Sequence, residues 1–244
     1  MSEPLLFVAA DRREFSGWVS RWESVRPVSL AVNWARAGKW KGRSVAAIAN
    51  GAGAERAFAA VILAGKISAV CNTGFCGALD EALGIGDVVV ATEVREVRAV
   101  RNDTRTWVAA DPTGYSGNER AGFARAVPVP VISIDHVAQT AAEKRDLRAA
   151  GGSVVEMEAA GVARAAEDLG IPFFCVRAVS DLATDDFAND FNAALTPEGE
   201  FSVARLVAGA LSNPVERFGE LLRLQRRTAL ASKKLGEFLA DCNF

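Results

Sequence analysis

The sequence predicts a single α/β domain with a largely parallel central sheet. Short apolar runs rich in valine, isoleucine and phenylalanine alternate along the chain with longer stretches of helical period, and this order is typical of strands joined by helices. The 244 residues are enough for one large domain with a substantial core. We find no internal repeat and no low-complexity linker that would divide them.

The apolar runs are expected to form strands, and they are Leu5–Ala10, Arg43–Asn50, Ser68–Thr73, Asp87–Glu93, Val129–Ile134, Val154–Met157 and Phe173–Val179. The stretches of helical period are expected to form helices, and they are Ala54–Lys66, Ala138–Ala150, Ala159–Leu169 and the long amphipathic segment Val215–Leu239. The glycines of Gly74-Phe75-Cys76-Gly77 predict a loop after the third strand. Arg98–Val127 is charged and contains the turn-rich DPTGYSGNER, so it is expected to be a surface excursion.

Composition and charge argue against several classes of partner. The formal net charge is −2, and the chain is 50% hydrophobic and 24% charged, which is ordinary for a globular protein. This balance gives no electrostatic reason to expect nucleic acid or an anionic membrane. The first apolar run is too short for a signal peptide or a membrane span. We therefore expect a cytoplasmic protein that acts on a small molecule.

The cysteines and the single histidine do not predict a metal site. Cys71, Cys76, Cys175 and Cys242 form no CxxC pair, and His136 is distant from them in sequence. A zinc site of the Cys/His type is therefore not expected. We expect reduced thiols and a protein that works without metal or organic cofactor.

Carboxylates follow several of the expected strands, where ligands bind in open α/β sheets. They are Glu14, the pair Glu156 and Glu158, and Asp181, with Asp135 further out. Cleavage of a glycosidic bond passes through a cationic, oxocarbenium-like state. It needs one carboxyl group to protonate the leaving group, and often a second to activate water. The positions of these carboxylates suit that reaction.

Two sequence blocks carry a resemblance to a known family. VEMEAA at Val155–Ala160 is followed by a helix and then by VRAVSD at Val176–Asp181, while NTGFCGAL at Asn72–Leu79 precedes GDVVV at Gly86–Val90. The chain thereby resembles the nucleoside phosphorylase and nucleosidase superfamily over roughly Leu5 to Leu182, and above all methylthioadenosine/S-adenosylhomocysteine nucleosidases. The resemblance implies a three-layer α/β sandwich, a purine nucleoside substrate and a homodimer whose pockets are completed across the subunit interface.

The resemblance also implies roles for residues at the sugar. Met157 and Glu158 would hold the ribose, because a carboxylate can accept hydrogen bonds from two vicinal hydroxyls. Glu14 would position and deprotonate the attacking water, although a glutamate after a strand is also common as a helix-start residue. Gly74 and Phe75 belong to the second block and are assigned to the substrate site.

At the base, the resemblance makes Asp181 the general acid that protonates N7 of the purine. Ser180 and Arg177 would orient it. His136 follows a strand in the region where relatives line the base pocket, so it is either a substrate contact or a solvent-facing side chain. Glu156 is left outside the catalytic set, as a candidate for a structural ion pair.

Hydrolysis is favoured over phosphorolysis. Related phosphorylases carry an arginine at the position of Asn72 and a serine or threonine at that of Phe75, so two donors to a phosphate are replaced. Glu14 would also repel a phosphate dianion. The turn Gly51-Ala52-Gly53 resembles a phosphate cradle, but it occurs in phosphorylases and hydrolases alike.

Three alternatives stay open at this point. The first is a phosphate-dependent phosphorylase of the same superfamily. The second is cleavage of a bulkier adenosyl compound, because the segment beyond Leu182 resembles the hopanoid-associated phosphorylase-like branch. The third is a non-catalytic nucleoside-binding protein, and the presence of Glu14, Glu158 and Asp181 together argues against it.

Overall fold

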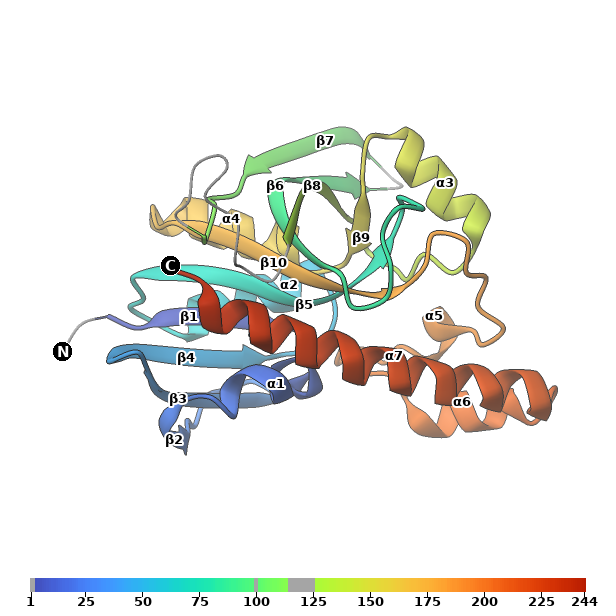
Figure 1. Ribbon diagram of the computed structural model, residues 1–244, viewed down its shortest axis with the longest axis horizontal. Coiled ribbons are helices and arrows are strands. Elements are labelled where there is room, and N and C mark those ends of the chain that lie inside the picture. The colour runs from blue at the N-terminus through green and yellow to red at the C-terminus, as the bar shows by residue number, and fades with distance from the viewer. Residues whose placement is uncertain (1–2, 99–100, 114–125) are drawn as a thin grey trace.

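The computed structural model describes residues 3–98, 101–113 and 126–244. The strands are β1 (Leu5–Ala9), β2 (Glu23–Pro27), β3 (Trp34–Trp40), β4 (Arg43–Ala49), β5 (Ala69–Ala78), β6 (Val88–Arg98), β7 (Arg101–Val108), β8 (Ala126–Ser133), β9 (Val154–Glu156) and β10 (Phe173–Asp181). The helices are the 3-10 helix η1 (Arg12–Phe15), α1 (Ser16–Val19), α2 (Ala54–Leu63), α3 (Ala141–Ala149), α4 (Ala159–Leu169), α5 (Phe191–Ala194), α6 (Val203–Ala210) and α7 (Pro214–Asp241). Figure 1 shows their arrangement.

The strands form one mixed sheet that closes on itself at one end. β4, β1, β5 and β10 run parallel as one block, and β6, β8 and β9 form a second parallel block. Antiparallel pairing of β10 with β6 and of β5 with β9 joins the two blocks. Because β10 also pairs with β5, the strands β5, β10, β6, β8 and β9 form a closed ring. Residues on β5 and β10 therefore lie at the junction of both blocks.

Helices cover both faces of the sheet, as predicted. In β1, Leu6 and Val8 face the apolar cluster under α2 and α4, while Leu5 and Phe7 face the cluster under α1 and α7. This alternation follows from the period of two residues in a strand. In Figure 1, α7 crosses the front of the sheet, and α2 and α4 lie behind it. The three layers hold the ends of β1, β5 and β10 in fixed positions.

Two expectations from the sequence are corrected. The segment Gly74–Gly77 is no loop: β5 continues through it, because Gly74 and Cys76 pair in register with Arg177 and Val179 of β10. The expected surface excursion includes a strand, since Arg101–Val108 pairs antiparallel with β6. The rest of DPTGYSGNER beyond residue 113 lies outside the described residues.

The structure also answers two smaller questions. All four cysteines are free and buried, in agreement with the expected reduced thiols. Across the described ranges, no helix is both long enough and apolar enough to cross a membrane.

Candidate active site

The centre of the candidate site is the buried guanidinium of Arg177 on β10. Its Nη2 donates to the carboxylate of Glu156, to Oε2 of Glu158 at 3.2 Å and to the amide oxygen of Asn72, while Nη1 donates to the carbonyl of Phe75 at 3.3 Å. Burial works against its charge, but the carboxylates of Glu156 and Glu158 raise the pKa of Arg177 further above its ordinary value. A buried charge needs such partners. Arg177 therefore draws β5 and β9 together.

The two glutamates reach Arg177 because β9 ends where α4 begins. Glu156 Oε2 accepts the backbone N–H groups of Glu158 at 2.9 Å and Ala159 at 2.8 Å, and an anion is favoured at a helix start. Together with its contact to Arg177, Glu156 therefore forms the structural ion pair for which it was a candidate. Met157 lies between the two glutamates and is also buried.

Glu158 is held between Arg177 and the turn before α2. Its Oε1 accepts from the N–H of Gly53 at 3.2 Å. Burial raises the pKa of Glu158 to about 7; Arg177 opposes this rise, and the nearby carboxylates of Glu156 and Glu14 add to it. A glutamate of this kind holds a proton easily near neutral pH.

Glu14 is a helix-start residue of η1, as one of the two expectations has it, and it also contacts β5. Its Oε2 accepts the N–H of Asp11 at 2.8 Å in a capping box of η1, while Oε1 accepts the N–H of Phe75 on β5 at 2.7 Å. Burial raises the pKa of Glu14, and the charge of Arg177 works against the rise. Glu14 therefore caps the start of η1 and also contacts the middle of β5.

Gly74 allows this approach of Glu14 to the strand. Its φ is +134°, and a Cβ atom there would lie 2.3 Å from Glu14 Oε1 and 2.9 Å from Arg177 Nη1. The neighbouring Phe75 contributes its backbone to Glu14 and Arg177, and its side chain packs against the apolar cluster under α7. Position 74 therefore tolerates only glycine without displacing one of the two charged groups.

Asp181 is the last residue of β10. It pairs with Gly77 of β5, three residues beyond Gly74. Its Oδ2 is 3.0 Å from Ser180 Oγ, and its Oδ1 accepts from Lys144 Nζ at 2.5 Å. A Cβ atom at Gly77 would be 2.7 Å from that same Oδ1. The expectation that Arg177 orients Asp181 is corrected, because the guanidinium binds the glutamates and the cation on Asp181 is Lys144. Ser180 does contact Asp181 as expected.

Sequence reasoning missed Lys144. The charged segment around it predicts a solvated helix, and α3 is mostly exposed. The signal available was its position three residues after Ala141, which places both on one side of the helix; they are the two buried residues of α3.

His136 is separate from this group of contacts. Its Nδ1 is 2.8 Å from Asp135 Oδ1 and its Nε2 is 2.6 Å from Glu143 Oε1, and its side chain is 42% exposed. Partial burial works against a charge, but these two hydrogen bonds raise the pKa of His136. Both ring nitrogens already have carboxylate partners, which fits the solvent-facing alternative.

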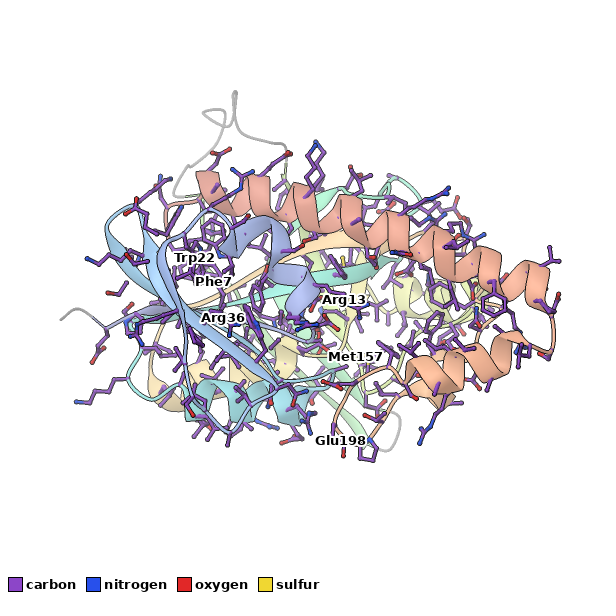
Figure 2. The ribbon with its side chains drawn as sticks, turned by 90° about the horizontal axis from the view of Figure 1, so that it is seen from below. Phe7, Arg13, Trp22, Arg36, Met157 and Glu198 are labelled. Carbon is purple, nitrogen blue, oxygen red and sulfur yellow. The ribbon has the colours of Figure 1, made fainter. Side chains whose placement is uncertain are left out.

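The turn before α2 closes another side of the site. The N–H of Gly51 donates to the carbonyl of Ala10, that of Ala52 to the carbonyl of Gly199, and that of Gly53 to Glu158. In the view of Figure 2, Met157 appears between Arg13, from the segment after β1, and Glu198, from the loop before α6. The hydrogen bonds of Gly53 and Ala52 bring the turn before α2 to Glu158 and to Gly199 in the loop before α6. Among the described residues, no group of histidine, cysteine, aspartate and glutamate side chains could hold a metal ion.

A comparison with protein families matches residues 29–212 to the phosphorylase superfamily, a range that holds most of this site but not Glu14. The chain belongs to the phosphorylase superfamily. The match includes β5, β9 and β10, and therefore Arg177, Glu158 and Asp181.

Named relatives within the superfamily are nucleosidases. The chain is 33% identical over 165 residues to the 5′-methylthioadenosine/S-adenosylhomocysteine nucleosidase of Glaesserella parasuis serovar 5, covering 61% of this chain and 70% of the relative. It is 27% identical over 194 residues to the nucleosidase of the same name from Shewanella oneidensis, covering 68% of this chain and 78% of the relative.

Solved structures share the fold of this superfamily member. A 5′-methylthioadenosine/S-adenosylhomocysteine nucleosidase from S. pneumoniae, with a transition-state inhibitor, aligns with a TM-score of 0.72 at 16% identity, over 98% of this chain and 97% of that one. A futalosine hydrolase mutant of Helicobacter pylori aligns with a TM-score of 0.73 at 16% identity, over 98% of both chains. The predicted fold class is thereby confirmed.

Proposed function

We propose that this protein hydrolyses the N-glycosidic bond of an adenine nucleoside with a 5′-thio substituent, such as methylthioadenosine or S-adenosylhomocysteine. The observation that carries the proposal is the placement of two buried carboxylates along β5. Glu14 lies against Gly74 and Asp181 against Gly77, which are about 10 Å apart along a strand that rises about 3.3 Å per residue. The two carboxylates thus approach β5 at separate points, as the acid and the base of a glycoside hydrolysis act at separate points of the sugar.

The reaction then uses each group once. Asp181 donates a proton to N7 of the purine, and the electron pair of the bond between C1′ and N9 moves into the base. Positive charge develops at C1′ and the ring oxygen of the ribose. Glu14 accepts a proton from water as the water oxygen bonds to C1′. Glu158 accepts hydrogen bonds from the ribose hydroxyls. The products are the free base and the free sugar.

The charges around Arg177 favour such a cationic transition state. One guanidinium is in electrostatic contact with Glu14, Glu156 and Glu158. Three carboxylates thus share one guanidinium in this cluster. Fixed negative charge near a developing oxocarbenium ion stabilises it most where water is excluded. The raised pKa of Glu14 also makes it a stronger base than an ordinary glutamate.

Several hydrogen bonds favour water over phosphate as the nucleophile. The amide of Asn72 is used within the protein, since its nitrogen donates to the carbonyl of Val8 at 3.3 Å and its oxygen accepts from Arg177. The N–H groups of the turn Gly51-Ala52-Gly53 already have protein acceptors. A phosphate at this turn would lack these donors and would lie near the carboxylate of Glu158.

The test is product analysis by chromatography. The protein is incubated with methylthioadenosine, S-adenosylhomocysteine, adenosine and inosine, each with and without phosphate. We expect adenine and free sugar at the same rate in both conditions, with preference for the 5′-thio nucleosides. Release that requires phosphate would make the protein a phosphorylase. Tight binding without release from any of the four would refute nucleosidase activity on this substrate class.

Two variants connect the activity to the carboxylates. We expect Glu14→Gln and Asp181→Asn each to lower kcat by about 100-fold or more, since general acid–base groups contribute about 10²- to 10⁴-fold. Glu23→Gln, an exposed glutamate on β2, is the matched control and should keep wild-type kcat. Full activity in Asp181→Asn would remove the acid from the mechanism.

We also propose that the protein is a homodimer. Exposed apolar side chains on α6, and on the turn and first half of α7, support this, and they include Val203, Val207, Leu211, Val215 and Leu222. Exposed apolar surface of this kind commonly marks an interface. Size-exclusion chromatography with light scattering measures the mass in solution. Replacing Leu211 and Val215 by glutamate should convert a dimer to a monomer, and a wild-type monomer would refute the proposal.

A further inference from the structure

Lys144 is a second buried cation, and the mechanism proposed above does not use it. Its side chain is fully buried, and Nζ donates to Asp181 Oδ1 at 2.5 Å and to the carbonyl of Leu182 at 2.8 Å. The ring centroid of Phe187 lies 5.1 Å from Nζ. Burying an ammonium group is costly unless it is paired. Its charged partner is the carboxylate that we propose as the acid.

The helix that carries Lys144 is fixed to the segment that follows Asp181. The N–H of Ala141, in the first turn of α3, donates to Asp186 Oδ1 at 2.7 Å. In the opposite direction, the N–H of Phe187 donates to the carbonyl of Gln139 at 2.9 Å. These two hydrogen bonds join the start of α3 to the segment after Asp181. Lys144 Nζ is therefore held in place relative to Asp181.

The two oxygens of Asp181 have different surroundings. An ammonium group has donors and no acceptor, so Oδ1 must accept from Lys144 and has no room for a proton of its own in that direction. Ser180 Oγ is 3.0 Å from Oδ2 and 3.2 Å from the carbonyl of Cys76. A hydroxyl has one proton, and the carbonyl can only accept. When Ser180 donates to Cys76, its oxygen can accept a hydrogen bond from a protonated Oδ2.

We propose that Lys144 is a positioning residue for Asp181, which keeps Oδ1 unprotonated and so places the transferable proton on Oδ2. This inference rests on the proposed function. In the step itself, the bond from Oδ2 to its proton breaks and a bond from N7 to that proton forms. The resulting carboxylate is paired with the ammonium of Lys144 and regains a proton from solvent after the base leaves. Lys144 thus stabilises a charge that appears only as the proton is transferred.

The experiment compares Lys144→Met and Lys144→Arg with Arg145→Met, an exposed cation on the same helix that serves as the matched control. With methylthioadenosine, we expect kcat of Lys144→Met to fall about 10- to 100-fold with little change in KM, as for loss of a transition-state interaction. Lys144→Arg should keep part of the activity, and Arg145→Met should equal the wild type.

The pH profile gives a readout that a merely structural role would not change. Removing the ammonium charge favours the protonated form of the neighbouring acid, so the high-pH limb of kcat should move to higher pH in Lys144→Met and stay in place in Lys144→Arg. In an Asp181→Asn background, Lys144→Met should cause no further loss. If Lys144→Met does not fold, Lys144→Arg and its combination with Asp181→Asn carry the same test.

The outcomes separate the two proposals. Wild-type kcat and an unshifted profile in Lys144→Met would overturn the role of Lys144 while the proposed function stands. A further loss in the Asp181→Asn background of the same size as in the wild type would also overturn it, because Lys144 would then act elsewhere. Absence of adenine release by the wild-type protein would overturn the proposed function and this inference with it.

Discussion

Replacing Glu158 by glutamine should change how the stability of this protein depends on pH. Burial raises the pKa of Glu158 to about 7 in the folded protein, against an ordinary value of 4.5. At about 1.4 kcal/mol per pH unit, this rise corresponds to about 3 kcal/mol of folding free energy. The cost is present only when the folded protein must hold Glu158 ionised.

The sign follows from proton binding. Between pH 4.5 and about 7 the folded state keeps the proton of Glu158 while the unfolded chain releases it. The folded state therefore binds more protons in this range, and the free energy of unfolding decreases as the pH rises. The loss begins above the unfolded value and is complete above the folded one. Glutamine carries no titrating proton and should remove this contribution.

The assay is urea unfolding followed by tryptophan fluorescence at pH 5 and pH 8, for which the chain has five tryptophans. We expect the drop in unfolding free energy between these pH values to be smaller in Glu158→Gln than in the wild type, by up to about 3 kcal/mol. Part of the wild-type dependence should persist, because the pKa of Glu14 is also raised. Glu23→Gln on the exposed strand β2 is the control. An equal drop in Glu158→Gln and wild type would refute the reasoning.

Three further predictions concern close packing and buried side chains. Gly74→Ala should cost about 1–3 kcal/mol of stability and most of the activity, measured by Tm and kcat, since its Cβ would meet Glu14 Oε1 at 2.3 Å; wild-type values for both would contradict the close approach. Glu220→Ala should cost about 1–3 kcal/mol in urea unfolding, because this buried carboxylate accepts the N–H groups of Ala188 and Asn189 at 2.9 and 2.8 Å; an unchanged midpoint would argue against that anchor. The native protein should resist a thiol reagent that reacts with four cysteines after denaturation, because all are buried and burial raises their pKa; rapid labelling of the native protein would contradict this.

Much of the fold could be predicted from the sequence because its central strands are buried on both faces. β1 is apolar throughout, and helix Ala159–Leu169 was predicted with the bounds of α4. The hairpin of β2 and β3 was missed because it is a sheet edge with polar and exposed residues and no continuous apolar run. Propensity alone is a weak guide at such edges.

The glycines of β5 show a different limit. Gly74 and Gly77 predict a loop by local rules, yet both lie within a strand. The reason is tertiary: each is a point where a carboxylate approaches the backbone, Glu14 at Gly74 and Asp181 at Gly77. Glycine in a strand commonly marks such an approach, but the partner side chain comes from another part of the chain. Local sequence therefore cannot distinguish this use from a turn.

The candidate site was predicted by residue type, while its pairing was not. Asp181 and Glu14 are predicted as carboxylates at strand ends, and the family resemblance implies that Arg177 orients Asp181. β9 and β10 both pair with β5, so Arg177 reaches Glu156 at the end of β9 and Glu158 in the following turn, while Asp181 lies four residues further along β10. That leaves Asp181 to the helix packed beyond the end of β10, where Lys144 is the buried cation. In the mechanism that we propose, Asp181 and Glu14 therefore have separate charge partners, so that protonation of the base and activation of water can be adjusted by separate residues.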